Sequence, residues 1–207
     1  PFVQYAAGQL TSAVAVGDFN GDGVPDIARG HHDGVFTSLL FGRGDGSFDA
    51  TPAYPSGAGS GDIASADLNG DRLADVVTVG DAGVLSVLLR RADGGFGPAT
   101  SYAAQRGNLQ LADLNGDGVP DIVTQWNLDV SVLLNRGDGT FDDGGAYATT
   151  MECAPVLLAD FNGDGLPDMA AAHKYDAALE LFLGWGDGTF ASATVQPLVA
   201  SQAVAAG

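Results

Sequence analysis

The stretch at residues 18–28 reads DFNGDGVPDIA, and close copies of it return three times along the chain. The copies read DLNGDRLADVV at residues 67–77, DLNGDGVPDIV at residues 113–123 and DFNGDGLPDMA at residues 160–170. Successive copies begin 49, 46 and 47 residues apart. A nearly constant period of this length indicates that one supersecondary unit is repeated four times.

Two further markers keep step with this Asp-rich loop. A Gly-rich turn ends in an aromatic residue at Phe48, Phe96, Phe141 and Phe190. Six residues later stands a tyrosine at Tyr54, Tyr102 and Tyr147, with Gln196 in the fourth place. Between the markers lie short apolar or alternating runs bounded by turn residues, which is typical of β-strands. Four strands in a unit of about 47 residues predict a propeller blade.

We therefore expect an all-β protein, with a single β-propeller domain of four-stranded antiparallel blades over residues 1–207. The repeats are expected near residues 12–54, 62–102, 108–147 and 155–197. Residues 1–8 read as a spare copy of the outer strand. Two arrangements stay open: the four blades close into a ring, or they form part of a larger propeller that another chain completes.

The composition is strongly acidic. Of the 207 residues, 26 are Asp or Glu and 8 are Lys or Arg, which gives a formal net charge of -18. A phosphate backbone is bound by clustered Lys and Arg, so this composition argues against a nucleic-acid partner. No apolar run approaches the ~20 residues that cross a bilayer. Cys153 is the only cysteine, which excludes an intrachain disulfide.

The acidic residues are almost all Asp, and half of these stand in the repeated loops; Glu occurs only at Glu152 and Glu180. The pattern DxNxDGxxD places oxygen-bearing side chains at positions 1, 3, 5 and 9, and glycine at position 6 supports a sharp turn. The carbonyl at position 7 can add a ligand, as in EF-hand loops. Oxygen-only ligands favour calcium over zinc or copper. The closing carboxylate at position 9 argues against a true EF-hand.

We therefore expect up to four calcium ions, one in each loop. The alternative is that the loops are Asp-Gly turns whose side chains satisfy their own backbone, although three crowded carboxylates repel one another without a cation. The predicted ligands are Asp18, Asn20, Asp22, the Val24 carbonyl and Asp26; Asp67, Asn69, Asp71, the Leu73 carbonyl and Asp75; Asp113, Asn115, Asp117, the Val119 carbonyl and Asp121; and Asp160, Asn162, Asp164, the Leu166 carbonyl and Asp168.

The second loop differs from the others. Arg72 replaces the glycine at position 6, and Ala74 replaces the proline seen in the other copies. A left-handed backbone conformation disfavours a residue with a side chain, and the guanidinium can partly neutralise Asp71 or Asp75. We expect this calcium site to be the weakest or empty.

The loops and turns, with DFNGDGVPDIA and VSVLLNRGDGTF as they stand here, resemble the calcium-binding FG-GAP and FG-GAP-like (VCBS) repeats of integrin α subunits and secreted microbial proteins. The likeness covers nearly the whole chain. It implies a β-propeller with calcium between the first two strands of each blade. It also implies an extracellular or cell-surface setting, with glycan, protein or adhesion partners. Integrin propellers carry seven blades, so four repeats depart from that pattern.

In up-and-down blades, the Asp-rich loops and the Gly-rich turns lie on one rim, and the tips between the second and third strands lie on the other. The tips are diverse, which marks them as a candidate ligand surface. Aromatic, imidazole and carboxamide groups there can stack on and hydrogen-bond a sugar or anchor a protein. The alternative is a set of solvated loops. The candidate ligand-binding residues are His31, His32, Asp33, Trp126, His173 and Tyr175.

These observations favour a secreted calcium-binding module that binds extracellular glycan or protein, without a catalytic residue that the motifs identify. One competing hypothesis is a carbohydrate-active lyase or hydrolase on a propeller scaffold. Another is a structural propeller segment that assembles with a second copy of the chain.

Overall fold

The computed structural model describes residues 11–31, 36–56, 61–80, 82–153, 155–175 and 177–197. Within these ranges the chain forms sixteen strands and no helix, so no helix there could span a membrane. The strands are β1 (Thr11–Gly17), β2 (Asp26–His31), β3 (Phe36–Gly42), β4 (Phe48–Pro55), β5 (Asp62–Ala66), β6 (Asp75–Val79), β7 (Val84–Leu88), β8 (Thr100–Ala103), β9 (Asn108–Ala112), β10 (Asp121–Trp126), β11 (Asp129–Asn135), β12 (Phe141–Ala148), β13 (Leu157–Ala159), β14 (Asp168–Ala172), β15 (Ala178–Phe182) and β16 (Thr194–Pro197).

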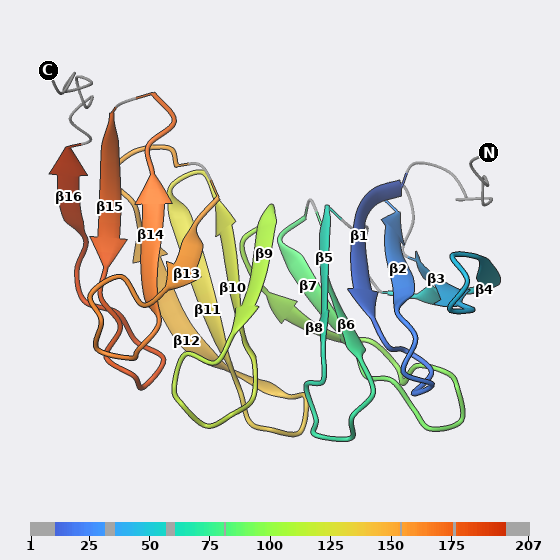
Figure 1. The fold of residues 1–207 in the computed structure, drawn as a ribbon. Helices are drawn as coiled ribbons and strands as arrows, with labels where there is room; N and C mark the ends of the chain where they lie inside the picture. Colours follow the sequence, from blue (N-terminus) through green and yellow to red (C-terminus); the bar gives the residue numbers. More distant parts are fainter. Residues whose placement is uncertain are drawn as a thin grey trace, which may run out of the picture.

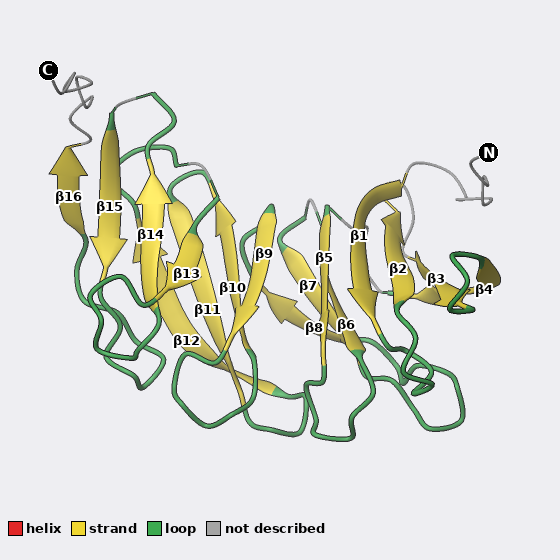
Figure 2. Cartoon of the chain, viewed as in Figure 1, coloured by secondary structure: helices red, strands yellow, loops and turns green. Residues whose placement is uncertain are grey.

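The strands form four separate sheets, and each sheet contains four strands in chain order (Figures 1 and 2). All pairings are antiparallel, from β1 with β2 to β15 with β16. Each sheet coincides with one sequence repeat, so the predicted propeller blades are confirmed. The outermost place of the last sheet is taken by β16, so the last blade completes itself. The spare outer strand predicted at residues 1–8 lies outside the described residues.

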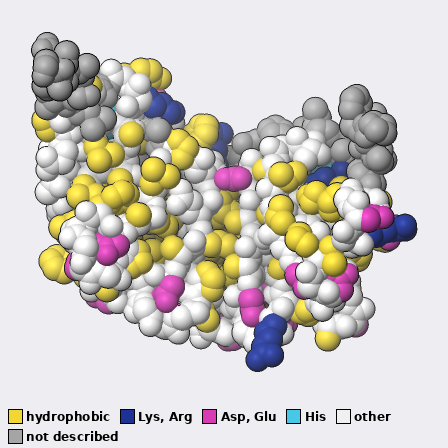
Figure 3. Space-filling model, in the orientation of Figure 1, with side chains coloured by type: hydrophobic (Ala, Val, Ile, Leu, Met, Phe, Trp, Pro, Cys, Tyr) yellow, Lys and Arg dark blue, Asp and Glu magenta, His cyan; other side chains and the backbone are white. Residues whose placement is uncertain are grey.

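Figure 1 shows the four blades following one another along an open arc, with the first and last blades at its two ends. The innermost strands β1, β5 and β9 pack side by side. The Asp-rich loops lie on the lower edge, which we call the first rim, and the hairpins that join second and third strands lie on the upper edge, the second rim. Acidic side chains gather toward the first rim in Figure 3.

The core lies between neighbouring blades. The second strand β6 (DVVTV) is buried along its whole length, because both faces of its blade are covered; this suits its continuous run of Val and Thr. One cluster joins the first two blades and includes Phe19, Leu39, Ile63 and Leu88. Equivalent clusters join the second blade to the third and the third to the fourth.

The Tyr and Phe markers meet across the blade interfaces. Tyr102 of one blade packs edge-on against Phe141 of the next, with ring centroids 5.6 Å apart, and its hydroxyl accepts a hydrogen bond from the Phe141 amide at 3.2 Å. Tyr147 and Phe190 repeat this arrangement at 5.4 Å and 3.1 Å. The sequence shows these residues as periodic, and the structure shows that their role is to join successive blades.

At each end of the arc, no described residues form a further blade against the outer face of the end blade. Phe161 of the last blade is 47% exposed, whereas Phe19, Leu68 and Leu114 at the same repeat position are buried against the following blade. Val14 of the first blade is 59% exposed, whereas its equivalents Ile63, Leu109 and Val156 are buried against the preceding blade. The two faces are therefore of the kinds that pack together inside the arc.

Candidate metal loops and ligand pocket

The first Asp of each loop holds the loop backbone. Asp18 Oδ1 accepts hydrogen bonds from the amides of Gly21 at 2.7 Å and Asp22 at 3.2 Å, and Oδ2 accepts one from Gly23 at 2.8 Å. The loops that begin at Asp67, Asp113 and Asp160 repeat these bonds. Backbone hydrogen bonds hold the pKa of Asp160 below its usual range. The Asp160 carboxylate is therefore presented in its charged form.

The side chains at positions 3 and 5 fold onto one another. In the first loop, Asn20 Oδ1 accepts a hydrogen bond from the Asp22 amide at 2.9 Å, and Asn20 Nδ2 donates to Asp22 Oδ2 at 2.9 Å. Asp22 Oδ1 accepts a further bond from the Val24 amide at 2.7 Å. These groups are exposed on the first rim, and the other three loops share the pattern.

The Asp at position 9 has a different environment, because it is completely buried. Asp121 Oδ2 accepts a hydrogen bond from the Leu114 amide at 2.9 Å, and Oδ1 accepts one from the Asn135 amide at 2.7 Å. The carboxylate thus ties the start of its loop to the end of the third strand. Asp26, Asp75 and Asp168 make the same two contacts in the other blades.

Burial raises the pKa of Asp26 and Asp121, and it raises the pKa of Asp75 to about 6, against an ordinary value of 3.8. The neighbouring carboxylates act in the same direction, whereas the backbone hydrogen bonds oppose the shift. Folded Asp75 binds its proton more tightly than the unfolded chain does. Its contribution to stability is therefore fully present below the unfolded pKa and is lost as the pH rises through about 6.

The donor set of the loops fits a hard cation. Carboxylate, amide and carbonyl oxygens are the ligands that calcium prefers, and no nitrogen or sulfur ligand belongs to the pattern. Asp18, Asn20, Asp22 and Asp26 and their equivalents would hold the ion, which would supply the positive charge that each acidic loop lacks. Among the described residues, the three carboxylates of a loop do not all lie within 4.8 Å of one another. Binding would therefore draw them together.

The loop backbone requires left-handed residues at two positions. Position 6 has positive φ in all four loops, at Gly23, Gly118, Gly165 and Arg72, where φ is 70°. This confirms that Arg72 occupies a conformation that disfavours a side chain. Among the described residues its guanidinium forms no ion pair with Asp71 or Asp75. Position 4 is also left-handed and always glycine, a requirement that the repeated Asn-Gly dipeptide signals.

Polar contacts between neighbouring blades run along the first rim. The amide of Ala74 donates to the carbonyl of Asp18 at 3.1 Å. Asn135 Nδ2 donates to the carbonyl of Leu68 at 3.0 Å, and Arg90, at the equivalent position, donates to the carbonyl of Phe19. Both side chains are buried. The repeat pattern does not mark Arg90 and Asn135, because the same repeat position holds glycine in the first and last blades.

The second rim carries a pocket of about 420 Å³ where the innermost strands of three blades begin. Trp126 from the end of β10 lines it together with Asn108 of β9, Asp62 of β5 and Ser12 of β1. Trp126 is 39% exposed, and Arg106 stacks over its ring at 4.1 Å from the centroid. This site brings one aromatic ring and several polar groups to one hollow, a combination that can stack on and hydrogen-bond a ligand.

The other candidate ligand-binding residues do not join this pocket. The ring of His31 pairs with Ser38 at 2.9 Å, and the side chain of Tyr175 is exposed. The side chain of His173 is buried against Glu180 and is not available at the surface. His32 and Asp33 lie outside the described residues. Asn108, Asp62 and Ser12 were missed, because they stand at ordinary strand starts and only the fold brings them together.

Comparison with protein families covers more than half of the chain. FG-GAP-like repeats match residues 67–124 and 113–171, and an FG-GAP repeat matches residues 10–30. The chain belongs to the FG-GAP-like repeat family. This confirms the resemblance that the Asp-rich loops indicated. No curated protein matches this FG-GAP-like chain by sequence.

Several solved structures share the fold. An Agrocybe aegerita lectin, described as recognising non-reducing terminal N-acetylglucosamine, is 25% identical with a TM-score of 0.60; the match covers 87% of this chain and 50% of the lectin. Saccharomyces cerevisiae Sqt1 is 11% identical with a TM-score of 0.61, covering 87% and 46%. A Lactobacillus plantarum protein is 12% identical with a TM-score of 0.58, covering 96% and 59%. The FG-GAP-like chain thus spans about half the length of these structures.

Proposed function

We propose that this chain is a calcium-stabilised β-propeller module of the extracellular space or cell surface, which binds glycans through the pocket on its second rim. The observation that carries the proposal is the pocket itself, where Trp126, Asn108, Asp62 and Ser12 converge. The lectin that shares the fold at 25% identity supports a glycan, in particular one that ends in N-acetylglucosamine.

The pocket is suited to a sugar because it combines a fixed ring with fixed polar groups. Arg106 covers one face of the Trp126 indole and orients the ring. Gly107 allows the backbone to pass close to the Trp126 ring. A Cβ atom at position 107 would lie 2.8 Å from Trp126 Cε3 and 2.7 Å from the Gln125 carbonyl oxygen. Asp62 is held by the amides of Ile63 and Leu109 at 2.9 and 3.0 Å. A preorganised site of this kind loses little side-chain entropy on binding.

Substitution of Trp126 tests the proposal. The Trp126→Ala variant should bind a glycan ending in N-acetylglucosamine at least about tenfold more weakly, because a buried aromatic contact typically contributes more than 1 kcal/mol. Isothermal titration with the calcium-saturated protein measures this. Trp185→Ala is the matched control, since Trp185 is exposed on the first rim.

Three outcomes would contradict the glycan proposal. An equal loss of glycan affinity in Trp126→Ala and Trp185→Ala would indicate that the glycan binds elsewhere. An array on which the wild-type chain binds only proteins would favour the protein-binding alternative. Release of products from a polysaccharide would favour a lyase or hydrolase.

The outer faces of the two end blades support a second candidate function, the assembly of a larger propeller from two copies of the chain. Phe161 of one copy would pack as Phe19, Leu68 and Leu114 pack inside the arc, against a first blade that presents Val14. Such an interface continues the blade interfaces already present, and propellers of up to about eight blades are known.

The mass in solution tests this assembly. We expect a dimer at micromolar concentration by analytical ultracentrifugation, and a monomer after Phe161→Asp, because a charge cannot be buried unpaired between blades. Tyr175→Asp, in the exposed segment between β14 and β15 on the second rim, should leave the dimer intact. A wild-type monomer at all concentrations would reject assembly from two copies.

A further inference from the structure

A second group of metal-ligating side chains lies on the last blade, and its ligand types differ from those of the Asp-rich loops. Cys153 precedes β13, His173 follows β14 and Glu180 lies in the middle of β15. Cys153 and His173 face one another in an isolated antiparallel bridge. One ligand atom from each of the three residues lies within 4.8 Å of the other two. Among the described residues, no other His, Cys, Asp and Glu side chains form such a group.

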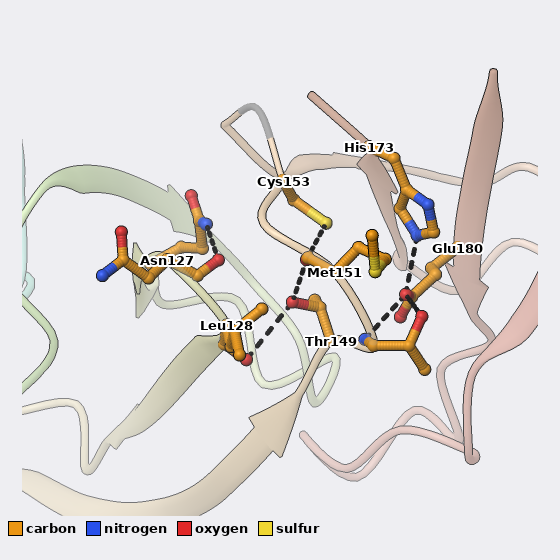
Figure 4. Close-up of polar contacts among 9 residues, drawn as sticks. Asn127, Leu128, Thr149, Met151, Cys153, His173 and Glu180 are labelled. Atoms are coloured by element: carbon orange, nitrogen blue, oxygen red, sulfur yellow. Dashed lines mark hydrogen bonds and ion pairs between the residues drawn. The ribbon is translucent and has the colours of Figure 1, made fainter. Parts of the chain in front are cut away.

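The polar atoms of this group are unevenly satisfied (Figure 4). Glu180 Oε1 accepts hydrogen bonds from the Thr150 amide at 2.7 Å and the Thr150 hydroxyl, and it pairs with His173 Nε2 at 2.8 Å. Glu180 Oε2 and His173 Nδ1 are buried without a hydrogen-bond partner. The side chains are 0% and 4% exposed. Buried polar atoms without a hydrogen-bond partner cost free energy. A ligand that binds to them is one explanation for their presence.

The equivalent positions of the first blade hold a histidine with different neighbours. Thr11 pairs with His31 in the strand register as Cys153 pairs with His173. Ser38 pairs with His31 as Glu180 pairs with His173. The last blade therefore keeps the histidine and replaces a threonine and a serine by a thiol and a carboxylate. Both replacements add a metal ligand.

We propose that Cys153, His173 and Glu180 bind a divalent transition metal of the zinc type, distinct from the calcium of the loops. Zinc prefers thiolate, imidazole and carboxylate ligands in a tetrahedron, where bonds of about 2.0 to 2.3 Å place ligand atoms roughly 3.3 to 3.8 Å apart. A small inward shift brings the three side chains to that spacing, and water completes the fourth position.

Binding changes the protonation of the site. Burial raises the pKa of the Cys153 thiol, so the metal-free protein carries the thiol at neutral pH. The metal replaces the thiol proton, which is released to water, and His173 binds through the lone pair of a neutral ring nitrogen. Thiolate and carboxylate then balance the two positive charges of the ion.

The position of the site suggests a structural role. Cys153 belongs to the segment that links the third blade to the fourth, and Thr149 of this segment bonds to the carbonyl of Leu128 in the third blade. His173 and Glu180 belong to the fourth blade. A bound metal would fasten the connection to the end blade.

Cobalt binding tests the proposal, because thiolate coordination of Co²⁺ produces a near-ultraviolet charge-transfer band that oxygen ligands do not. The protein is first saturated with calcium, so that the loops are occupied. We expect one cobalt ion per chain with this band, displacement by zinc, and a higher melting temperature with zinc. Cys153→Ala should abolish the band, and Glu180→Gln should weaken cobalt binding at least tenfold. The control His31→Gln, at the equivalent position of the first blade, should retain the band.

Circular dichroism of each variant establishes that the strands are retained. If Glu180→Gln fails to fold, Cys153→Ala alone decides the result, since it removes only one small side chain. Absence of the band in folded wild-type protein at stoichiometric cobalt would overturn the proposal. Persistence of the band in Cys153→Ala would overturn it as well.

Discussion

Chelation of calcium should lower the melting temperature of this protein by roughly 15 °C or more. An ion that binds only the folded state stabilises it by about 2.7 kcal/mol at a concentration 100 times its Kd. Three well-formed loops together give roughly 8 kcal/mol, and each kcal/mol shifts the melting temperature by about 2 to 4 °C in a chain of this size. Differential scanning calorimetry in chelator, then with calcium restored, measures the shift.

The second loop provides an internal comparison for this experiment. Arg72 holds a left-handed conformation at the position where the other loops have glycine. Calcium titration of the wild-type chain should therefore resolve three strong sites and one weak or absent site. Arg72→Gly should restore the fourth site and relieve about 1 kcal/mol of backbone strain even without calcium. Unchanged melting at millimolar calcium would contradict calcium sites in the loops and leave them as self-satisfied turns.

The second large effect is expected from the buried Asp at position 9. Asp121→Ala should destabilise the protein by about 3 kcal/mol, because the amides of Leu114 and Asn135 both lose their acceptor in a buried site. The loss should be present with and without calcium, since these contacts hold the loop to β11 independently of an ion. Urea unfolding measured in chelator and in calcium gives both values.

Asp117→Ala is the matched control for this prediction. Asp117 belongs to the same loop but is exposed, and its carboxylate bonds only within the loop. Its substitution should lower the free energy of unfolding only slightly in chelator. It should remove most of the stabilisation that calcium gives this loop. Equal costs for the two variants in chelator would show that the buried hydrogen bonds of Asp121 are not what holds the loop in place.

The fold could be predicted from the sequence, because aligning the four copies of the repeat identifies the turns and strands that they share. The loops from Asp18, Asp67, Asp113 and Asp160 fixed the number of blades, and the positive φ of Arg72 follows from its alignment with glycine. Periodicity also showed that Tyr102 and Phe141 matter. It did not show that they pack on one another, because that contact joins two different repeats.

Features that occur in only one repeat were harder to predict. His173 stands at a hairpin tip, where the sequence predicts an exposed side chain, but the fold pairs it with buried Glu180. The pocket at Trp126 depends on strand starts from three blades, and no local pattern marks Asn108 or Ser12. The sequence also did not reveal the different roles of the loop carboxylates, since it does not show that Asp121 is buried and Asp117 is exposed.

The most direct test of the glycan-binding account uses the two tryptophans as reporters. Trp126 lies in the pocket on the second rim, and Trp185 lies in a Gly-rich turn on the first rim. In a ¹H–¹⁵N spectrum the chain gives two indole N–H signals, which Trp126→Phe assigns. Addition of a glycan ending in N-acetylglucosamine to the calcium-saturated protein should shift the Trp126 signal and leave the Trp185 signal in place. A shift of Trp185 alone, or of neither signal at saturating glycan, would contradict the account.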